Sequence, residues 1–230
     1  ALVLPTWFDP VKFVQDSAAS SFFEDFSRPD GPAGNGWVDM PSNGQGDLVI
    51  HNGSLSTPGP NGSGGVYRPL DLSSPVTLSA TFSYLNGYGG ALYRYDTSFL
   101  FGSNGSGDSG YGVVFARGDQ NYSDSTVYLV QNGAILDFRR STFQFADMLT
   151  TSLTWNPDGS IKGTVSGAAN SFAFSFAPRT AVLAGQNFAV RLGFPDGRSG
   201  LIVNPTVDDL RLVSNAPVAN EVVLNFTGAI

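Results

Sequence analysis

The sequence contains no cysteine. Disulfides and thiolate metal sites are therefore excluded, and the core must be held together by packing alone. Charged residues are also scarce, at 13% of the chain against about 25% in an average soluble domain. Lysine and glutamate, which usually fill exposed helix surfaces, occur only as Lys12, Lys162, Glu24 and Glu221. This scarcity argues against long exposed helices.

Two further absences exclude classes of partner. The formal net charge is −7, so the chain lacks the basic footprint that nucleic-acid binding needs. Neutral glycans are compatible with this charge, because hydrogen bonds and stacking hold them. No apolar run is long enough to cross a bilayer, so we expect no membrane insertion. Ala1 fits removal of an initiator methionine or cleavage of a signal peptide, and we favour the first.

Segments with alternating polar and apolar residues recur along the chain and predict strands. In Val76–Tyr84, alternate residues are apolar and the intervening ones are serine or threonine. This pattern predicts an antiparallel strand with one buried and one solvated face. Similar segments are Asp47–His51, Gly65–Pro69, Ala91–Tyr95, Tyr111–Ala116, Thr126–Val130, Ser171–Phe176, Asn187–Phe194 and Val207–Val213.

Two turns connect strands into hairpins. Asn132-Gly133 lies between two apolar segments, and this dipeptide is the strongest short hairpin pattern. Asn156-Pro157-Asp158-Gly159 joins the strand ending at Trp155 to the one starting at Ile161. Short helices are expected only around Phe13–Ala19 and Phe145–Leu149. We therefore predict an all-β fold of two antiparallel sheets, with helix below about 10% of residues.

The two ends differ from the middle of the chain. Residues 1–20 carry Trp7, Phe8 and Phe13 without strand or helix periodicity, and residues 215–230 end in an apolar segment. Such ends must be covered either by this domain or by a neighbouring chain. We therefore divide the chain into an N-terminal docking arm (1–20), a sandwich (21–214) and a C-terminal extension (215–230). Because oligomers usually close by symmetry, we expect a homo-oligomer held partly by the arms.

Three segments together resemble the concanavalin A-like (laminin G-type) sandwich superfamily. They are the opening Phe23–Trp37, the strand Tyr111–Ala116 with the hairpins that follow it, and the closing strand Val207–Leu212. The resemblance implies a jelly-roll sandwich. The opening also resembles phage minor tail and tail-tip proteins, which implies a virion component that partners other virion proteins and host-surface glycans. The alternative hypothesis is a secreted bacterial carbohydrate-binding domain or polysaccharide lyase. A third hypothesis is a structural module without a ligand.

The opening segment makes local predictions of its own. Phe23 and Phe26 cannot share one face of a regular strand, so we expect a bend near Asp25. Arg28–Gly31 and Gly34–Gly36 have the composition of turns. The second turn directs Trp37 onto the sheet, where we expect the indole to pack in the core.

Catalytic residues are missing from the expected places, so we predict that the chain is not an enzyme. Glucanases of the superfamily carry Glu-x-Asp-x-x-Glu, and retaining glycosidases need two carboxyl groups about 5 Å apart. Glu24 and Glu221 stand far apart in the sequence, and Asp208 and Asp209 are neighbours that a regular strand would point to opposite faces. His51 is the sole imidazole.

Tyrosine and arginine residues offer a candidate glycan platform. Sugar binding needs aromatic side chains with hydrogen-bonding neighbours. Such residues gather in the middle of the chain, and the candidates for glycan contact are Tyr88, Tyr93, Arg94, Tyr95, Tyr111, Arg117 and Tyr122.

A calcium site is a second candidate, because many domains of the superfamily hold this ion. Asp119, Asn121 and Asp124 cluster oxygen-bearing side chains in one segment, although the spacing is not that of an EF-hand. The segment Gly102–Gly110, with Asn104 and Asp108, offers further oxygen atoms. Turn residues are themselves Asp, Asn and Gly, so two flexible polar loops without metal are the favoured interpretation. We expect no obligatory cofactor, and a location in the virion or, in the alternative, outside the cell.

Overall fold

A computed structural model of the chain describes residues 20–40, 47–58, 63–70, 75–83, 95–117, 125–143, 145, 148–192 and 205–214. These residues form strands and connections, with no helix among them. The predicted all-β class is confirmed. In this described part, no helical segment has the length and apolar character needed to span a bilayer.

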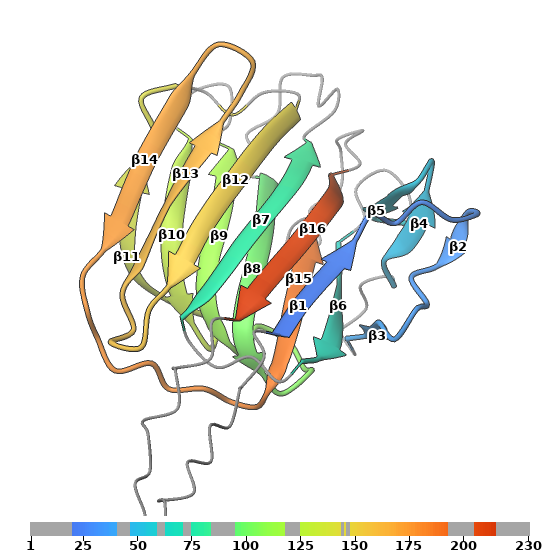
Figure 1. The fold of residues 1–230 in the computed structure, drawn as a ribbon, viewed down its shortest axis with the longest axis horizontal. Helices are drawn as coiled ribbons and strands as arrows, with labels where there is room; N and C mark the ends of the chain where they lie inside the picture. The colour runs from blue at the N-terminus through green and yellow to red at the C-terminus, as the bar shows by residue number, and fades with distance from the viewer. Residues whose placement is uncertain are drawn as a thin grey trace, which may run out of the picture.

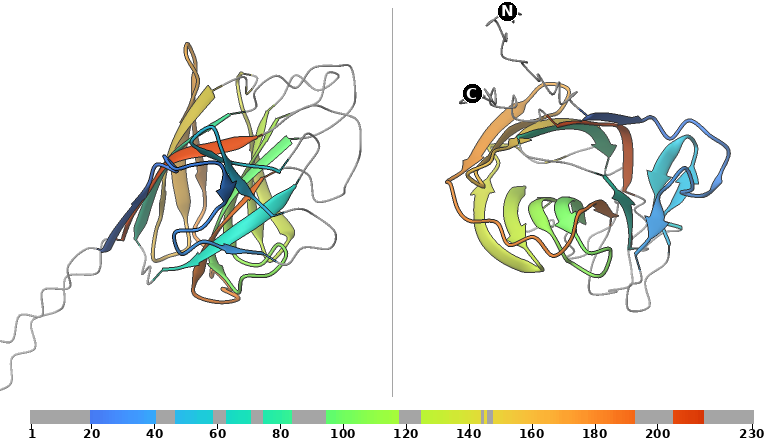
Figure 2. Two further views of the ribbon diagram at one scale, coloured as in Figure 1. Left: turned by 90° about the vertical axis from the view of Figure 1, so that its right-hand side faces the viewer. Right: turned by 60° about the horizontal axis from the view of Figure 1, so that its bottom comes forward.

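The strands form two antiparallel sheets that pack face to face (Figures 1 and 2). The nine-stranded sheet has the order β14-β13-β12-β7-β16-β5-β4-β2, with β1 paired to β16. Its strands are β1 (Ser20–Glu24), β2 (Gly31–Pro32), β4 (Val49–His51), β5 (Ser54–Ser56), β7 (Val76–Ser83), β12 (Met148–Trp155), β13 (Ile161–Ser166), β14 (Ser171–Phe176) and β16 (Thr206–Ser214).

The seven-stranded sheet has the order β11-β10-β9-β8-β15-β6-β3. Its strands are β3 (Val38–Asp39), β6 (Gly64–Pro69), β8 (Tyr95–Ser103), β9 (Tyr111–Arg117), β10 (Thr126–Gln131), β11 (Ala134–Arg140) and β15 (Asn187–Leu192). Because strands from all parts of the chain alternate between the two sheets, the sandwich is one unit built on a single core.

Alternation along the strands produces that core. In β7 the apolar side chains of Val76, Leu78, Ala80 and Phe82 are buried, as the sequence predicts. Aromatic rings fill the space between the sheets, with Phe82 5.1 Å from Phe115 between ring centroids. Burial of aromatic and aliphatic side chains is the main favourable term in folding a chain without disulfides.

The opening segment folds as predicted. Phe26 has a φ of 50°, which ends the strand geometry after β1 and turns its ring into the core while Phe23 stays exposed. The Trp37 amide donates to the Gly34 carbonyl (2.8 Å) and closes the second turn. Trp37 is buried and its ring lies 6.0 Å from Phe22. The predicted bend and the core position of Trp37 are both confirmed.

Both predicted hairpin turns are present. Asn132 and Gly133 have φ values of 49° and 82°, as a type I′ turn requires, and they join β10 to β11. The Gly159 amide donates to the Asn156 carbonyl (2.9 Å) in the turn between β12 and β13.

Two features differ from the sequence prediction or add to it. The expected helix at Phe145–Leu149 is wrong, because Met148 and Leu149 open β12 and Leu149 packs into the core. The helix expected at 13–19 lies outside the described residues. Asp209 has a φ of 48° and the register of β16 against β7 shifts between Asp208 and Arg211. This β-bulge interrupts the alternation assumed for the Asp208–Asp209 pair.

The sandwich has two distinct ends. At one end, which we call the strap end, the connection 177–186 (the strap) crosses from β14 to β15, and the amides of Ala184 and Gly185 donate to the Gly102 carbonyl. The first and last described residues, Ser20 and Ser214, pair with each other at this end. At the opposite end, which we call the loop end, three connections adjoin neighbouring strands of the seven-stranded sheet: 84–94 leads from β7 into β8, 118–124 follows β9 and 193–204 follows β15.

Candidate functional site

The outer face of the seven-stranded sheet is turned away from the core. Its side chains lie in rows, because antiparallel register sets residues of neighbouring strands opposite each other. Phe138 lies opposite Tyr128, and the row continues across the sheet through Val114, Ser98 and Arg191. A second row contains Val130, Gly112, Leu100, Ala189 and Tyr67.

Part of this face is covered by the connection 104–110. Gly105 lies so close to the Tyr67 ring that a Cβ atom there would be 2.8 Å from it. Asp108 in the same connection forms an ion pair with Arg191. Leu100 and Ala189 between these contacts are buried. In the half of the face near β6 and β15, the connection 104–110 therefore covers residues that would otherwise face solvent.

The other half, near β10 and β11, carries an exposed aromatic patch, defined by Tyr128, Ile135, Phe138 and Arg140. Ile135 and Phe138 are 55% and 48% exposed. The Phe138 ring lies 6.3 Å from Tyr128, and the Arg140 guanidinium carbon lies 5.9 Å from the Phe138 ring centre. Exposed rings beside a guanidinium can stack on the apolar face of a sugar and donate to its hydroxyls.

The aromatic patch adjoins the loop end. Thr126 at the start of β10 lies opposite both Arg140 and Ala116. The next residue on β9, Arg117, lies opposite Tyr95 on β8. The sequence-predicted candidates Tyr95 and Arg117 are thus backbone neighbours at the end of the sheet, next to the patch. Their side chains lie outside the described part.

The remaining glycan and metal candidates, apart from Tyr111, lie outside the described residues. They are Tyr88, Tyr93, Arg94, Tyr122, Asp119, Asn121 and Asp124. The segments that hold them begin or end at the loop end, beside Tyr95 and Arg117. Among the described residues, no group of three or more histidine, aspartate or glutamate side chains is placed to hold a metal ion.

The structure corrects the interpretation of Tyr111. Its side chain is fully buried and its hydroxyl donates to the Gly159 carbonyl, so it joins β9 to the β12–β13 turn inside the core. Burial raises the pKa of this hydroxyl, with Asp158 nearby acting in the same direction and Arg179 opposing it. Tyr111 therefore offers no surface to a glycan. Its position on a core-facing register explains the error, since amphipathic tyrosines occupy both environments.

Two of the described acidic groups, Glu24 and Asp208, have distinct environments. Glu24 is buried, and its carboxylate accepts from Arg28 (2.6 Å), Asn35 (2.8 Å) and the Trp37 indole (3.3 Å). Burial raises the pKa of Asp208, and the neighbouring carboxylates of Asp209 and Asp25 add to that rise.

The histidine is also engaged in a local contact. His51 Nδ1 lies 2.8 Å from Asp30 Oδ2 on the exposed side of β4. The Asn52 backbone amide and His51 both hold the pKa of Asp30 below its ordinary value. Asp30, His51 and Asn52 thus tie β4 to the turn before β2.

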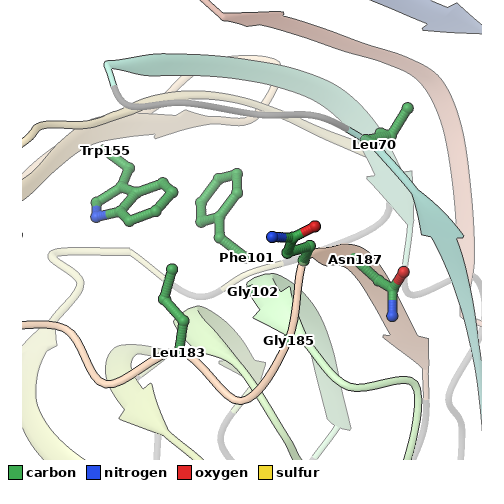
Figure 3. Close-up of a pocket in the computed structure, with 8 residues that line it drawn as sticks. Leu70, Phe101, Gly102, Trp155, Leu183, Gly185 and Asn187 are labelled. Atoms are coloured by element: carbon green, nitrogen blue, oxygen red, sulfur yellow. The ribbon is translucent and has the colours of Figure 1, made fainter.

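A small pocket lies at the strap end, between the two sheets (Figure 3). Its volume is about 210 Å³, and its walls include Phe101, Trp155, Leu183 and Asn187. Phe101 and Trp155 stack with ring centroids 5.1 Å apart. None of the described side chains that line it is charged, so this lining lacks the groups of a hydrolytic site.

No protein-family model and no curated protein matches the sequence. Solved structures match over most of the chain. Lectin UEA-II complexed with galactose has a TM-score of 0.62 at 12% identity, covering 87% of this chain and 100% of the lectin. The Emp47p carbohydrate recognition domain has a TM-score of 0.56 at 13% identity, covering 87% and 98%. The β-glucanase of Bacillus licheniformis has a TM-score of 0.56 at 11% identity, covering 85% and 98%.

The fold is the concanavalin A-like sandwich. The resemblance to that superfamily is confirmed at the level of the fold, whereas these neighbours lend no support to a phage origin. The same sandwich serves lectins and a glucanase, so the fold does not decide between binding and catalysis. That choice depends on the side chains of this chain.

The sequence pattern did not identify the residues of the aromatic patch, which are Tyr128, Ile135, Phe138 and Arg140. The Asn132-Gly133 turn places Val130 opposite Ile135, but one extra residue in β11 then shifts the register so that Tyr128 meets Phe138. A hairpin with a regular register would instead place Tyr128 opposite Asp137 and separate the two rings. Only the bulge brings the rings together.

Proposed function

We propose that the chain is a non-catalytic sandwich module that binds neutral glycans at the loop end of its seven-stranded sheet. The observation that carries the proposal is the exposed ring of Phe138, which lies beside the half-buried ring of Tyr128 and next to Arg140. Large exposed apolar side chains in a row mark interaction surfaces more often than chance exposure. The lectin names among the structural neighbours support a carbohydrate partner.

Charge supports a neutral ligand rather than an acidic one. The chain carries a net charge of −7, which repels anionic polymers at long range. Arg140 supplies a local donor, and Phe138 supplies the stacking face. A pyranose ring with hydroxyl groups fits both contacts, because it combines an apolar face with a polar rim.

The position of the first and last strands supports display of the module on a larger assembly. We propose that this assembly is a phage virion. Ser20 and Ser214 pair at the strap end, so residues 1–19 and 215–230 both attach there. The loop end lies at the far end of the same strands. A module attached in this way would direct its glycan site away from its anchor. The resemblance of Phe23–Trp37 to phage tail openings is the reason for preferring a virion over a secreted protein.

Calcium is an optional part of the proposal. Asp119, Asn121 and Asp124 follow Arg117 at the loop end, where an ion bound by carboxylate and amide oxygens would order the glycan-contacting connections. Glycan affinity measured with calcium and with a chelator tests the role of the ion. Equal affinity under both conditions would exclude calcium from the binding site without affecting the proposed glycan contacts.

The non-catalytic part is supported by the acidic groups. Glu24 is buried under three donors. The pKa of Asp208 is raised by burial and by the neighbouring carboxylates of Asp209 and Asp25, and its Oδ2 accepts a hydrogen bond from Ser54 Oγ (3.4 Å). We expect no release of reducing ends from polysaccharides. Hydrolysis that disappears in Asp208→Asn would overturn this expectation and favour an enzyme.

The binding proposal is tested with Phe138→Ala. Loss of the stacking ring should weaken binding of oligosaccharides ending in galactose or N-acetylgalactosamine, the sugars named with two of the lectin neighbours. The expected loss is about tenfold, which corresponds to about 1.4 kcal/mol. The matched control is Phe23→Ala, because Phe23 is also exposed, at 58%, but lies on the nine-stranded sheet. Titration calorimetry on both variants gives the comparison. Equal affinity of Phe138→Ala and the parent would exclude the aromatic patch as the site.

A further inference from the structure

The edge strand β14 itself contains none of the charges, prolines or bulges that usually protect an exposed sheet edge, and the charge beside it is Arg139 of β11, 5.0 Å from the ring centre of Phe176 at the end of the strand. Figure 1 shows β14 as the outermost strand of the nine-stranded sheet, and within the described residues it pairs only with β13. Proteins normally protect such edges with charges, proline or a bulge. Residues 163–177 contain neither a charged residue nor a proline, and the pairing of β13 with β14 has no bulge.

The hairpin turn determines which peptide groups of β14 are free. The Gly167 amide donates to the Asn170 carbonyl (2.8 Å), so Gly167 and Asn170 are a hydrogen-bonded pair. In antiparallel strands, hydrogen-bonded and non-hydrogen-bonded pairs alternate. Phe172 and Phe174 therefore bond to β13, whereas the N–H and C=O groups of Ser171, Ala173 and Ser175 point away from it.

The sequence of this edge is self-complementary. Residues 171–175 read Ser-Phe-Ala-Phe-Ser, which is the same in both directions. A two-fold axis at Ala173 would place Ala173 opposite its copy and Ser171 opposite Ser175 of the second strand. These are the residues whose peptide groups face no partner strand in the described part of the chain, so each opposed pair could exchange two hydrogen bonds.

The side chains on both faces of the edge fit the same arrangement. Ser171, Ala173 and Ser175 are exposed on the outer face and are small enough to lie side by side across the axis. On the core side, Phe172 is half-buried and packs against the core. In the two-fold pair it would lie opposite Phe174 of the second copy and lose its remaining contact with water, which favours association.

We infer that β14 is a homodimer interface, in which two copies pair antiparallel about Ala173 and join their nine-stranded sheets into one continuous sheet. The partner is a second copy of this chain, because the five-residue palindrome complements itself. This interface is independent of the proposed glycan site, which lies on the other sheet.

Disulfide trapping tests the register directly, since the chain contains no cysteine. Opposed residues of a hydrogen-bonded pair have Cα atoms about 5.5 Å apart, within the range that a disulfide spans. Ala173→Cys should therefore give a covalent dimer under mild oxidation. Ser171→Cys alone should not, because its partner is Ser175, whereas the double variant Ser171→Cys/Ser175→Cys should cross-link. Cross-linking of Ser171→Cys to the same extent as Ala173→Cys would overturn the register.

Proline scanning tests the interface without relying on oxidation. Ala173→Pro removes an N–H that points away from β13, and proline is tolerated at such edge positions. The variant should stay folded, shown by an unchanged β-type circular dichroism spectrum, and become monomeric in sedimentation equilibrium. Ser171→Lys/Ser175→Lys provides a second disruption by like-charge repulsion. The control Thr164→Lys adds one charge on β13, on the same face but away from the edge, and should leave the dimer intact. A monomeric parent chain, or a folded Ala173→Pro that stays dimeric, would overturn the inference.

Discussion

At the scale of single residues, Glu24 shows how a buried charge can stabilise a local fold. Burial by itself raises the pKa of Glu24, but hydrogen bonds from Arg28, Asn35 and the Phe26 amide outweigh it, and the pKa lies below its ordinary value. Together with the Trp37 indole, these donors connect β1 to both turns of the opening. The charged form is therefore the one that the folded state prefers.

A pH prediction follows from the lowered pKa of Glu24. The carboxylate stabilises the fold above the unfolded pKa of about 4.3, and this contribution is lost as pH falls through the lower folded pKa. Glu24→Gln should reduce the free energy of unfolding by about 1–3 kcal/mol at pH 7, and the difference from the parent should shrink towards pH 3. Urea unfolding at both pH values measures this. A difference that stays constant with pH would show that the charge does not matter.

The two described indoles are predicted to differ in their response to substitution. Trp37 and Trp155 are 6% and 7% exposed, so alanine at either position should cost about 3–5 kcal/mol. Phenylalanine should cost more at position 37 than at 155. Trp37 Nε1 donates to Glu24, whereas Trp155 Nε1 has no hydrogen-bond partner in the described structure. The test is the free energy of unfolding of the alanine and phenylalanine variants at both positions. Equal losses of stability for Trp37→Phe and Trp155→Phe would contradict the predicted difference.

At the scale of elements, the turn at Gly159 is fixed by the strap. Gly159 has a φ of 77°, and a Cβ atom there would lie 1.8 Å from the Arg179 carbonyl oxygen. Gly53 has a similar φ of 75° with no atom within 4 Å of its Cβ position. Gly53→Ala should therefore reduce the free energy of unfolding only by the backbone strain of about 1–2 kcal/mol. Gly159→Ala should reduce it by clearly more. Thermal melts of both variants measure this difference, because only Gly159→Ala adds a clash to the backbone strain. Equal drops in melting temperature would show that the strap moves aside without cost.

Elements with clean alternation were predictable from the sequence, and elements without it were not. β7 buries every second residue, so its faces follow directly from the sequence. β8 is different, because residues 97–101 are all buried and no alternation marks the strand. The sequence pattern accordingly indicated a strand only up to Tyr95. The bulges at Asp209 and in β11 depend on pairing with partner strands, which local sequence does not encode.

The sequence identified two residues beside the aromatic patch but none of the residues that define it. Tyr95 and Arg117 were identified as candidates, and the register places them together at the loop end. Phe138 and Arg140 were not identified, because β11 exposes most of its residues and its pattern contains no alternation. Tyr111 was assigned to the wrong environment, since its burial follows from contact with a turn 48 residues away in the sequence.

At the scale of the whole molecule, the arm attachment and the β14 edge are separate in space. The described strands run from Ser20 at the start of β1 to Ser214 at the end of β16, and these two residues pair with each other. The β14 edge lies at the opposite margin of the nine-stranded sheet from β2, with β1 attached at β16 between them. Docking through the arm and pairing through β14 can therefore be tested independently.

Deletion of residues 1–18 tests whether the N-terminal arm is needed for folding, for dimerisation or for docking. The truncated chain should stay folded, because every described strand pair is retained, and its melting temperature should change by no more than a few degrees. Dimerisation through β14 should persist in sedimentation equilibrium, while incorporation into virions should be lost if the arm docks onto the assembly. The matched control is Ala173→Pro in the full chain, which should show the reverse pattern of a monomer with the arm intact. A truncated chain that no longer folds would show instead that residues 1–18 belong to the core of the sandwich.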